Sequence, residues 1–190
     1  MNIENIEKLA IKYLVNSIEG LEIENPKIDF KRDWYDLKDS NGINEFLKDT
    51  TAIANTYGYS DGFIIIGFDD KKKEFKDSNF EDSKLKDKSD IPDIIIKRCS
   101  DLFNIGIYDV KYKEHKIAVI HIPPTFEKPI FIKNYQKIKE NAGIPHRVFV
   151  RKDSTIREAS KYDIEMMFYE RGNMQPDYDF DIRSVKDILF

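Results

Sequence analysis

The chain has a single cysteine, Cys99, among its 190 residues. An intrachain disulfide and a cysteine-based metal site are therefore both excluded. No apolar run approaches the roughly 20 residues that a membrane-spanning helix needs. The first ten residues, MNIENIEKLA, carry acidic side chains early and lack the apolar centre of a secretion signal. These absences predict a cytoplasmic protein that has no membrane partner.

Other absences narrow the chemistry. None of the three histidines has the spacing of a metal-ligand pair, and no Ser/His/Asp grouping stands out. A nucleotide-binding regulator would need a phosphate loop, but the G-x-x-x-x-G-K-[ST] motif is missing. Positive charge is not in excess either, because 31 Lys and Arg against 35 Asp and Glu give a formal net charge of −4. This balance argues against coating duplex DNA by bulk charge, and it is compatible with a local basic patch.

What the chain does contain is typical of one globular domain. Hydrophobic residues make up 41% of it, with 13 Phe and 10 Tyr, and 190 residues suffice for one sizeable core. Apolar spacing and turn residues predict a single α/β domain in which helices flank a mixed β-sheet. The expected helices cover residues 3–19, 43–54, 90–105 and 161–171, and the expected strands cover 27–31, 63–66, 107–113, 116–122, 127–133 and 147–151. We place the domain at residues 1–171 and its motifs at 20–170, and we expect 172–190 to be an acidic tail that docks on the domain or leads to further domains.

The segments between these elements carry fewer signals. Residues 71–90 are polar and charged, so we expect a long, mobile surface loop anchored by a few apolar side chains. Residues 134–145 are expected to form a second loop. The last helix should offer Ile164, Met167 and Phe168 to the core.

The unit from Ile43 to Asp70 carries the strongest pattern. An amphipathic helix leads through a glycine-containing turn into a β-branched, aromatic run at 63–66, which is typical of a strand covered on both faces. Asp69 and Asp70 follow its carboxyl end, where open α/β sheets place their ligands.

A second group of charges lies on the first expected strand. The residues alternate from Lys27 onward, so that Lys27, Asp29 and Lys31 share one face. Glu24 precedes Asp29 by five residues, and the break at Pro26 lets the chain bend until the two carboxylates converge. Periodicity alone favours a simpler alternative, an exposed strand face with alternating charges.

Carboxylates from separate segments provide a candidate metal site: Glu24, Asp29, and either Asp69 or Asp70. Hard cations such as Mg²⁺ or Mn²⁺ prefer oxygen ligands. Lys31 beside them would stabilise the negative charge that develops in metal-assisted phosphodiester cleavage. Asp29-Phe30-Lys31 also has the D-x-K spacing of many nucleases, although such a tripeptide is common by chance.

Several short motifs follow one another in a recognisable order. They are Glu24, Asp29-Phe-Lys31, Ala52-Ile-Ala-Asn55-Thr56, Gly62-Phe-Ile-Ile-Ile-Gly67-Phe-Asp69-Asp70, Pro129, and Val150-Arg151-Lys-Asp-Ser154-Thr155. This set resembles the Schlafen AlbA-type domain, whose pattern has an E-F-K strand, an A-x-A-N-T helix end, a strand closing in G-V-D-D and a late Y-V-R-x-G-S-x-T. The chain departs from that pattern at Asp29, where the family has a glutamate, and at Lys152-Asp153, where R-x-G is usual.

The resemblance implies nucleic-acid binding. In vertebrate relatives, two glutamates five residues apart and one aspartate form a metal-dependent ribonuclease site. By position these fall on Glu24, Asp29 and Asp69, with Asp70 as the alternative, and Lys31 joins the catalytic set. The basic residues expected to hold phosphates are Lys27, Arg32, Arg147, Arg151 and Lys152.

Two further expectations come from the same resemblance. Many bacterial relatives are DNA-binding or transcription-regulator modules, and some accompany phage defence. We therefore keep a non-catalytic binding or oligomerisation module as the alternative to a nuclease. Vertebrate relatives pair two such lobes, so a homodimer is expected, with the apolar stripe of helix 3–19 as its surface unless that stripe belongs to the core.

Overall fold

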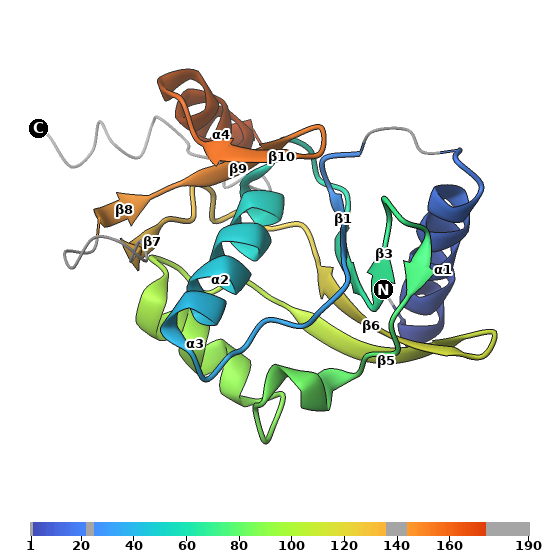
Figure 1. Ribbon diagram of the computed structural model, residues 1–190. Helices are drawn as coiled ribbons and strands as arrows, with labels where there is room; N and C mark the ends of the chain where they lie inside the picture. Colours follow the sequence, from blue (N-terminus) through green and yellow to red (C-terminus); the bar gives the residue numbers. More distant parts are fainter. Residues whose placement is uncertain (1, 22–24, 136–143, 174–190) are drawn as a thin grey trace, which may run out of the picture.

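The computed structural model describes residues 2–21, 25–135 and 144–173. At its centre is a four-stranded sheet with the strand order β1-β2-β6-β5 (Figure 1). The helices are α1 (Ile3–Ile18), α2 (Ser40–Asn55), α3 (Asp90–Arg98) and α4 (Lys161–Asn173), with a 3₁₀ turn, η1, at Phe80–Ser83. The strands are β1 (Ile28–Lys31), β2 (Gly62–Ile66), β3 (Phe68–Asp69), β4 (Glu74–Phe75), β5 (Gly106–Tyr112), β6 (His115–Ile122), β7 (Ile132–Tyr135), β8 (Ile144–Arg147), β9 (Phe149–Lys152) and β10 (Thr155–Glu158).

The sheet is mixed, as expected. β1 runs parallel to β2, whereas β6 runs antiparallel to both β2 and β5. Smaller two-stranded ladders join β3 to β4, β7 to β8 and β9 to β10. Helices cover the sheet, so the predicted α/β class is confirmed.

β2 is buried on both faces, as its apolar sequence predicts. Ile64 and Ile66 pack with α2 and α3 in one core cluster, while Phe63 and Ile65 pack with α1 in another. Figure 1 shows the corresponding layers, with α1 on one side of the sheet and α2 and α3 on the other.

The apolar stripe of α1 belongs to the core. Ile6, Ala10 and Leu14 are fully buried against the sheet, which follows from their three- and four-residue spacing. The alternative prediction, in which this stripe is a dimer surface, is therefore wrong, and any homodimer must use another face.

The start of α2 is fixed by a cap and a close backbone approach. The side chain of Asp39 accepts hydrogen bonds from the N–H groups of Asn41 and Gly42, which is a standard N-cap. Gly42 is required at this position because a Cβ atom there would lie 2.1 Å from the backbone oxygen of Asp36.

The end of α2 is tied to two distant segments by Asn55. Its buried side-chain amide donates to the carbonyl oxygens of Ile130 (2.8 Å) and Phe149 (3.1 Å) and accepts from the N–H of Ile130 (2.8 Å). These three hydrogen bonds satisfy backbone groups of two segments, the stretch before β7 and the strand β9.

Two loop predictions need correction. Residues 71–90 are not one long loop, because β4 pairs with β3 and η1 packs Phe80 into the core. The strand expected at 127–133 begins only at Ile132. It is β7, which pairs with β8. The ends of the loop expected at 134–145 are therefore in strands, and residues 136–143 lie outside the described chain.

Two element ends and one core residue also differ from expectation. α3 stops at Arg98, well before Gly106, because Cys99 takes extended backbone and forms a bridge with Ile132. The strand expected at 147–151 is interrupted at Val148 between β8 and β9. On α4, Met167 and Glu170 turn inward at three-residue spacing, which leaves Phe168 55% exposed.

Residues 174–190, most of the expected acidic tail, lie outside the described residues. Within the described ranges, no helix is long and apolar enough to cross a membrane.

We expect Asn55→Ala to destabilise the domain by about 2–4 kcal/mol, because it leaves buried backbone donors and acceptors at Ile130 and Phe149 without partners. Urea unfolding followed by Trp34 fluorescence measures the free energy of unfolding. Asn41→Ala, at an exposed position at the start of the same helix, is the control and should change it by less than about 0.5 kcal/mol. Equal effects of the two substitutions would contradict this role of Asn55.

Candidate functional site

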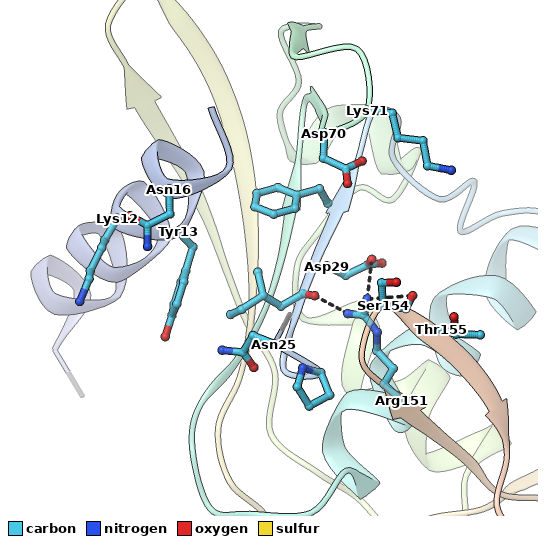
Figure 2. A pocket seen from close by; sticks show the side chains of 13 residues that line it. Lys12, Tyr13, Asn16, Asn25, Asp29, Asp70, Lys71, Arg151, Ser154 and Thr155 are labelled. Atoms are coloured by element: carbon cyan, nitrogen blue, oxygen red, sulfur yellow. Dashed lines mark hydrogen bonds and ion pairs between the residues drawn. The ribbon is translucent and has the colours of Figure 1, made fainter. Parts of the chain in front are cut away.

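A pocket of about 800 Å³ lies beside β1, at the edge of the four-stranded sheet. Figure 2 shows α1 on one side of it and the β9–β10 hairpin on the other. The lining residues are Lys12, Tyr13, Asn16, Asn25, Pro26, Ile28, Asp29, Phe30, Asp70, Lys71, Arg151, Ser154 and Thr155. Two of the predicted carboxylates, Asp29 and Asp70, are therefore brought into one pocket.

Asp29 is held by two cations. Its Oδ1 accepts a hydrogen bond from Nη2 of Arg151 at 3.1 Å, and its Oδ2 lies 3.4 Å from Nζ of Lys31. Burial raises the pKa of the Asp29 carboxyl above its usual value, although Arg151 and Lys31 act in the opposite direction. A carboxylate has about four acceptor positions, so Asp29 retains capacity for a further ligand.

Lys31 forms an ion pair with a carboxylate that sequence reasoning missed. Its Nζ lies 2.7 Å from Oδ2 of Asp49, a residue of α2 that is 1% exposed. The hydroxyl of Tyr35 donates to the same oxygen at 2.8 Å. Burial lowers the pKa of Lys31, but the charges of Asp49 and Asp29 outweigh it and the pKa is raised. The available signal was a carboxylate on the apolar face of a predicted helix.

The other oxygen of Asp49 is less well satisfied. Oδ1 is buried without a hydrogen-bond partner in the described chain, and Nζ of Lys48 lies 3.8 Å from it. Lys48 is itself paired with Glu45 on the helix surface. Lys31 is therefore the principal partner of Asp49.

Arg151 does not present its charge to the pocket as predicted. The side chain is 3% exposed, and its guanidinium donates to the carbonyl oxygen of Ile28, to Asp29 and to the carbonyl oxygen of Ser154. Its Nε is buried with no acceptor among the described residues. Arg151 thus fixes the β9–β10 hairpin against β1, and the predicted phosphate contact would have to compete with these hydrogen bonds.

Lys27 is also buried, although it was expected to hold phosphate. Its Nζ donates to the carbonyl oxygens of Ile53 (2.9 Å) and Thr56 (2.8 Å), which lie at the carboxyl end of α2. Burial, together with the nearby charge of Lys128, lowers the pKa of Lys27 to about 7. The side chain closes a helix end and is not available to a ligand.

Lys128 meets the same helix end from the other direction. Its Nζ donates to the carbonyl oxygens of Thr56 (2.9 Å) and Gly58 (3.3 Å) and pairs with Glu170 at 3.1 Å. Glu170 in turn accepts from the N–H of Gly58 at 2.8 Å. This buried ion pair anchors α4 to the domain.

The remaining predicted cations lie outside the pocket lining. Arg32 and Lys152 are exposed, and Arg147 forms an ion pair with Glu158. The lysines that do line the pocket are Lys12 on α1 and Lys71 after β3. The sequence pattern placed Lys71 at the start of a charged surface loop and did not single out Lys12.

The predicted third carboxylate has two very different candidates. Asp69 accepts hydrogen bonds from the N–H groups of Lys71 (3.2 Å) and Lys72 (3.1 Å) and is not part of the pocket lining. Asp70 does line the pocket (Figure 2). Glu24 lies outside the described residues. Within the described ranges, no three His, Cys, Asp or Glu side chains are grouped closely enough to hold a metal ion.

Fold and pocket together define an α/β domain whose site combines carboxylates and lysines beside a parallel edge strand. The sequence agrees with one family of such domains. Residues 24–160 match the family model described as Schlafen, AlbA_2, and the chain belongs to this family. No curated protein matches it significantly.

One solved structure adds a likeness of fold. The DIP2311 protein from Corynebacterium diphtheriae is 13% identical with a TM-score of 0.52, and the match covers 90% of this chain and 29% of that one. The chain thus spans less than a third of that protein's length. The N-terminal domain of a RecG-related protein from Nitrosomonas europaea is 16% identical with a TM-score of 0.43, over 76% of this chain and 94% of that one.

We expect Asp49→Asn to lower the pKa of Lys31, because the substitution removes the closest negative charge and keeps an oxygen for the Tyr35 hydroxyl. Titration of ¹³C-methylated lysines by NMR measures this pKa directly. Asp33→Asn, which removes an exposed partner of Lys76, is the matched control. An unchanged pKa of Lys31 in Asp49→Asn would contradict the assignment.

We also expect Lys27 to make the stability of the domain depend on pH. The unfolded chain keeps the proton on Lys27 up to about pH 10.5, whereas the folded chain releases it near pH 7. Between these values the unfolded state binds more protons, so the free energy of unfolding rises with pH. Lys27→Met should remove this rise, which amounts to at most about 1.4 kcal/mol per pH unit. Urea unfolding at pH 7, 8 and 9 measures it.

Lys8→Met, at an exposed lysine of α1, is the control for this measurement and should keep the slope of the unsubstituted protein. Equal slopes in all three proteins would show that Lys27 is protonated in the folded state throughout this range.

Proposed function

We propose that this domain binds nucleic acid in the pocket between α1 and the β9–β10 hairpin and, with Mg²⁺ or Mn²⁺, cleaves a phosphodiester bond. The observation that carries the proposal is the meeting of Asp29 and Asp70 in one pocket that Lys12 and Lys71 also line. Lysines bind phosphates, and carboxylate oxygens suit a hard divalent cation. Membership in the Schlafen, AlbA_2 family supports the nucleic-acid part of the proposal.

In this proposal, some residues would bind the cation and another would position one of its ligands. Asp29 and Asp70 would hold the cation, and Glu24, which the family resemblance assigns to the same carboxylate set, is proposed as a third ligand in preference to Asp69. The bound cation would activate the attacking oxygen and polarise the phosphate. Lys31 lies 3.4 Å from Asp29 but outside the pocket lining, so its proposed part is to position Asp29 for the cation.

One observation favours the second candidate, a non-catalytic binding module. Both oxygens of Asp29 already face cations, Arg151 at 3.1 Å and Lys31 at 3.4 Å. In that alternative, Asp29 only holds the hairpin to β1, and the lysines alone bind the strand. A role in bacterial defence and a homodimeric assembly remain predictions that rest on the family resemblance.

The two candidates respond differently to Asp29→Asn. In a nuclease, this substitution should lower cleavage by about 100-fold or more, because a ligand of the catalytic metal is lost. It should leave binding equal or tighter, because a charge that repels phosphate is gone. The asparagine keeps an oxygen for Arg151, which also bonds Ile28 and Ser154, and urea unfolding of this variant checks that the domain remains folded. A gel assay of labelled single-stranded RNA, tRNA and DNA with Mg²⁺, Mn²⁺ or EDTA measures cleavage.

Lys71→Ala is the complementary variant for this test. It should weaken binding and reduce the slope of log affinity against log salt by about one. Arg151→Ala is unsuitable, because the buried guanidinium supports the fold. If the unsubstituted protein cleaves no substrate with either metal, the binding module replaces the nuclease as the function.

A further inference from the structure

α1 lies outside the region that matches the family, yet it forms one wall of the pocket. The match begins at residue 24, whereas α1 covers Ile3–Ile18. Its residues Lys12, Tyr13 and Asn16 line the pocket on the side opposite Asp29 and Arg151 (Figure 2). This wall therefore brings to the pocket groups that the matched region does not contain.

Tyr13 provides a fixed aromatic surface in this wall. Its ring packs against the fully buried Phe63, with the ring centroids 5.7 Å apart and the planes inclined at 46°. The side chain is half-buried, and its hydroxyl makes no hydrogen bond within the described chain. An aromatic ring held in this way is the kind of surface on which nucleic-acid bases stack, whatever their sequence.

Two amides, those of Asn16 and Asn25, line the same pocket as this ring. The side chain of Asn16 makes no hydrogen bond with the part of the chain that the structure describes. Asn25 accepts from the N–H of Lys27 at 2.9 Å through Oδ1, which orients its amide and leaves the NH₂ group without an acceptor among the described residues. Such groups donate to and accept from the edges of unpaired bases.

We infer that the α1 wall binds the base of an unpaired nucleotide, with Tyr13 stacked on the base and Asn16 and Asn25 bonded to its edge. The ligand class is therefore single-stranded nucleic acid, an inference that rests on the proposed function. A volume of about 800 Å³ suits a nucleotide-sized group. A base inside a duplex reaches such a pocket only when it is unpaired and unstacked.

The phosphates on either side of this base have separate partners. Lys12 and Lys71 project from different sides of the pocket (Figure 2). Lysine contacts to phosphates position a strand without reading its sequence. The arrangement thus separates base recognition by the α1 wall from phosphate binding by the lysines.

Fluorescence anisotropy with labelled 12-nucleotide single-stranded RNA and DNA, and with a duplex of the same length, in EDTA, tests the inference. Tyr13→Ala should weaken single-strand binding by about 5- to 150-fold, and Tyr13→Phe should retain it. Asn16→Ala should weaken it by about 2- to 10-fold. Tyr162→Ala, at an exposed tyrosine of α4 that is not part of the pocket lining, is the matched control and should change nothing.

Several outcomes would overturn the inference and leave the proposed function standing. The first is equal affinity for single strand and duplex. The second is unchanged affinity in both Tyr13→Ala and Asn16→Ala, while Lys71→Ala still weakens binding. Competition by free AMP or UMP at the affinity of the 12-mer would make the ligand a mononucleotide and would also overturn it. If the unsubstituted protein binds no oligonucleotide, the proposed function fails with it. Asn16→Ala decides the question if circular dichroism shows that Tyr13→Ala does not fold.

Discussion

A buried guanidinium joins the two halves of the site. Arg151 reaches from β9 to β1, where it bonds the carbonyl of Ile28 and the carboxylate of Asp29, and it also bonds Ser154 in its own hairpin. Removing one partner of a buried ion pair costs about 3–5 kcal/mol, because the other charge is left uncompensated. The pocket wall at Ser154 and Thr155 therefore depends on this pair, and a residue that resembles a phosphate ligand in sequence is instead the support for the site.

The strand face that begins at Lys27 and continues along β1 presents three charged side chains, and each of them is held by its own partners. Lys27 closes the end of α2, Asp29 meets the hairpin, and Lys31 meets Asp49 on the buried flank of α2. Two of these charges are thus satisfied by α2 and one by the β9–β10 hairpin. β1 is the strand at which helix, hairpin and sheet are fitted together, and only Asp29 of the three lines the pocket.

The sequence was sufficient for the elements whose pattern is local. The apolar run of β2 and the stripe of α1 predicted the buried surfaces that the structure shows, whereas the alternation from Lys27 onward favoured an exposed strand face. The sequence was insufficient where partners are far apart, as they are along this strand face. The contacts of these charged side chains with Asp49, Ile53 and Arg151 decide between a buried and a solvated strand face. No local spacing in the sequence encodes those contacts. Asp49 itself was visible as a carboxylate on an apolar helical face, where an unpaired charge is too costly to leave.

Under the proposed function, the charges of the pocket would let an acidic chain bind a phosphate backbone. Three cationic side chains and two carboxylates line it, although the whole chain has a net charge of −4. Arg151 and Asp29 offset each other, so Lys12 and Lys71 outweigh Asp70 locally. Salt screens charges beyond about 8 Å at physiological ionic strength, so this local balance counts for more than the total. Binding and cleavage would then depend on different side chains, the lysines for the first and the aspartates for the second.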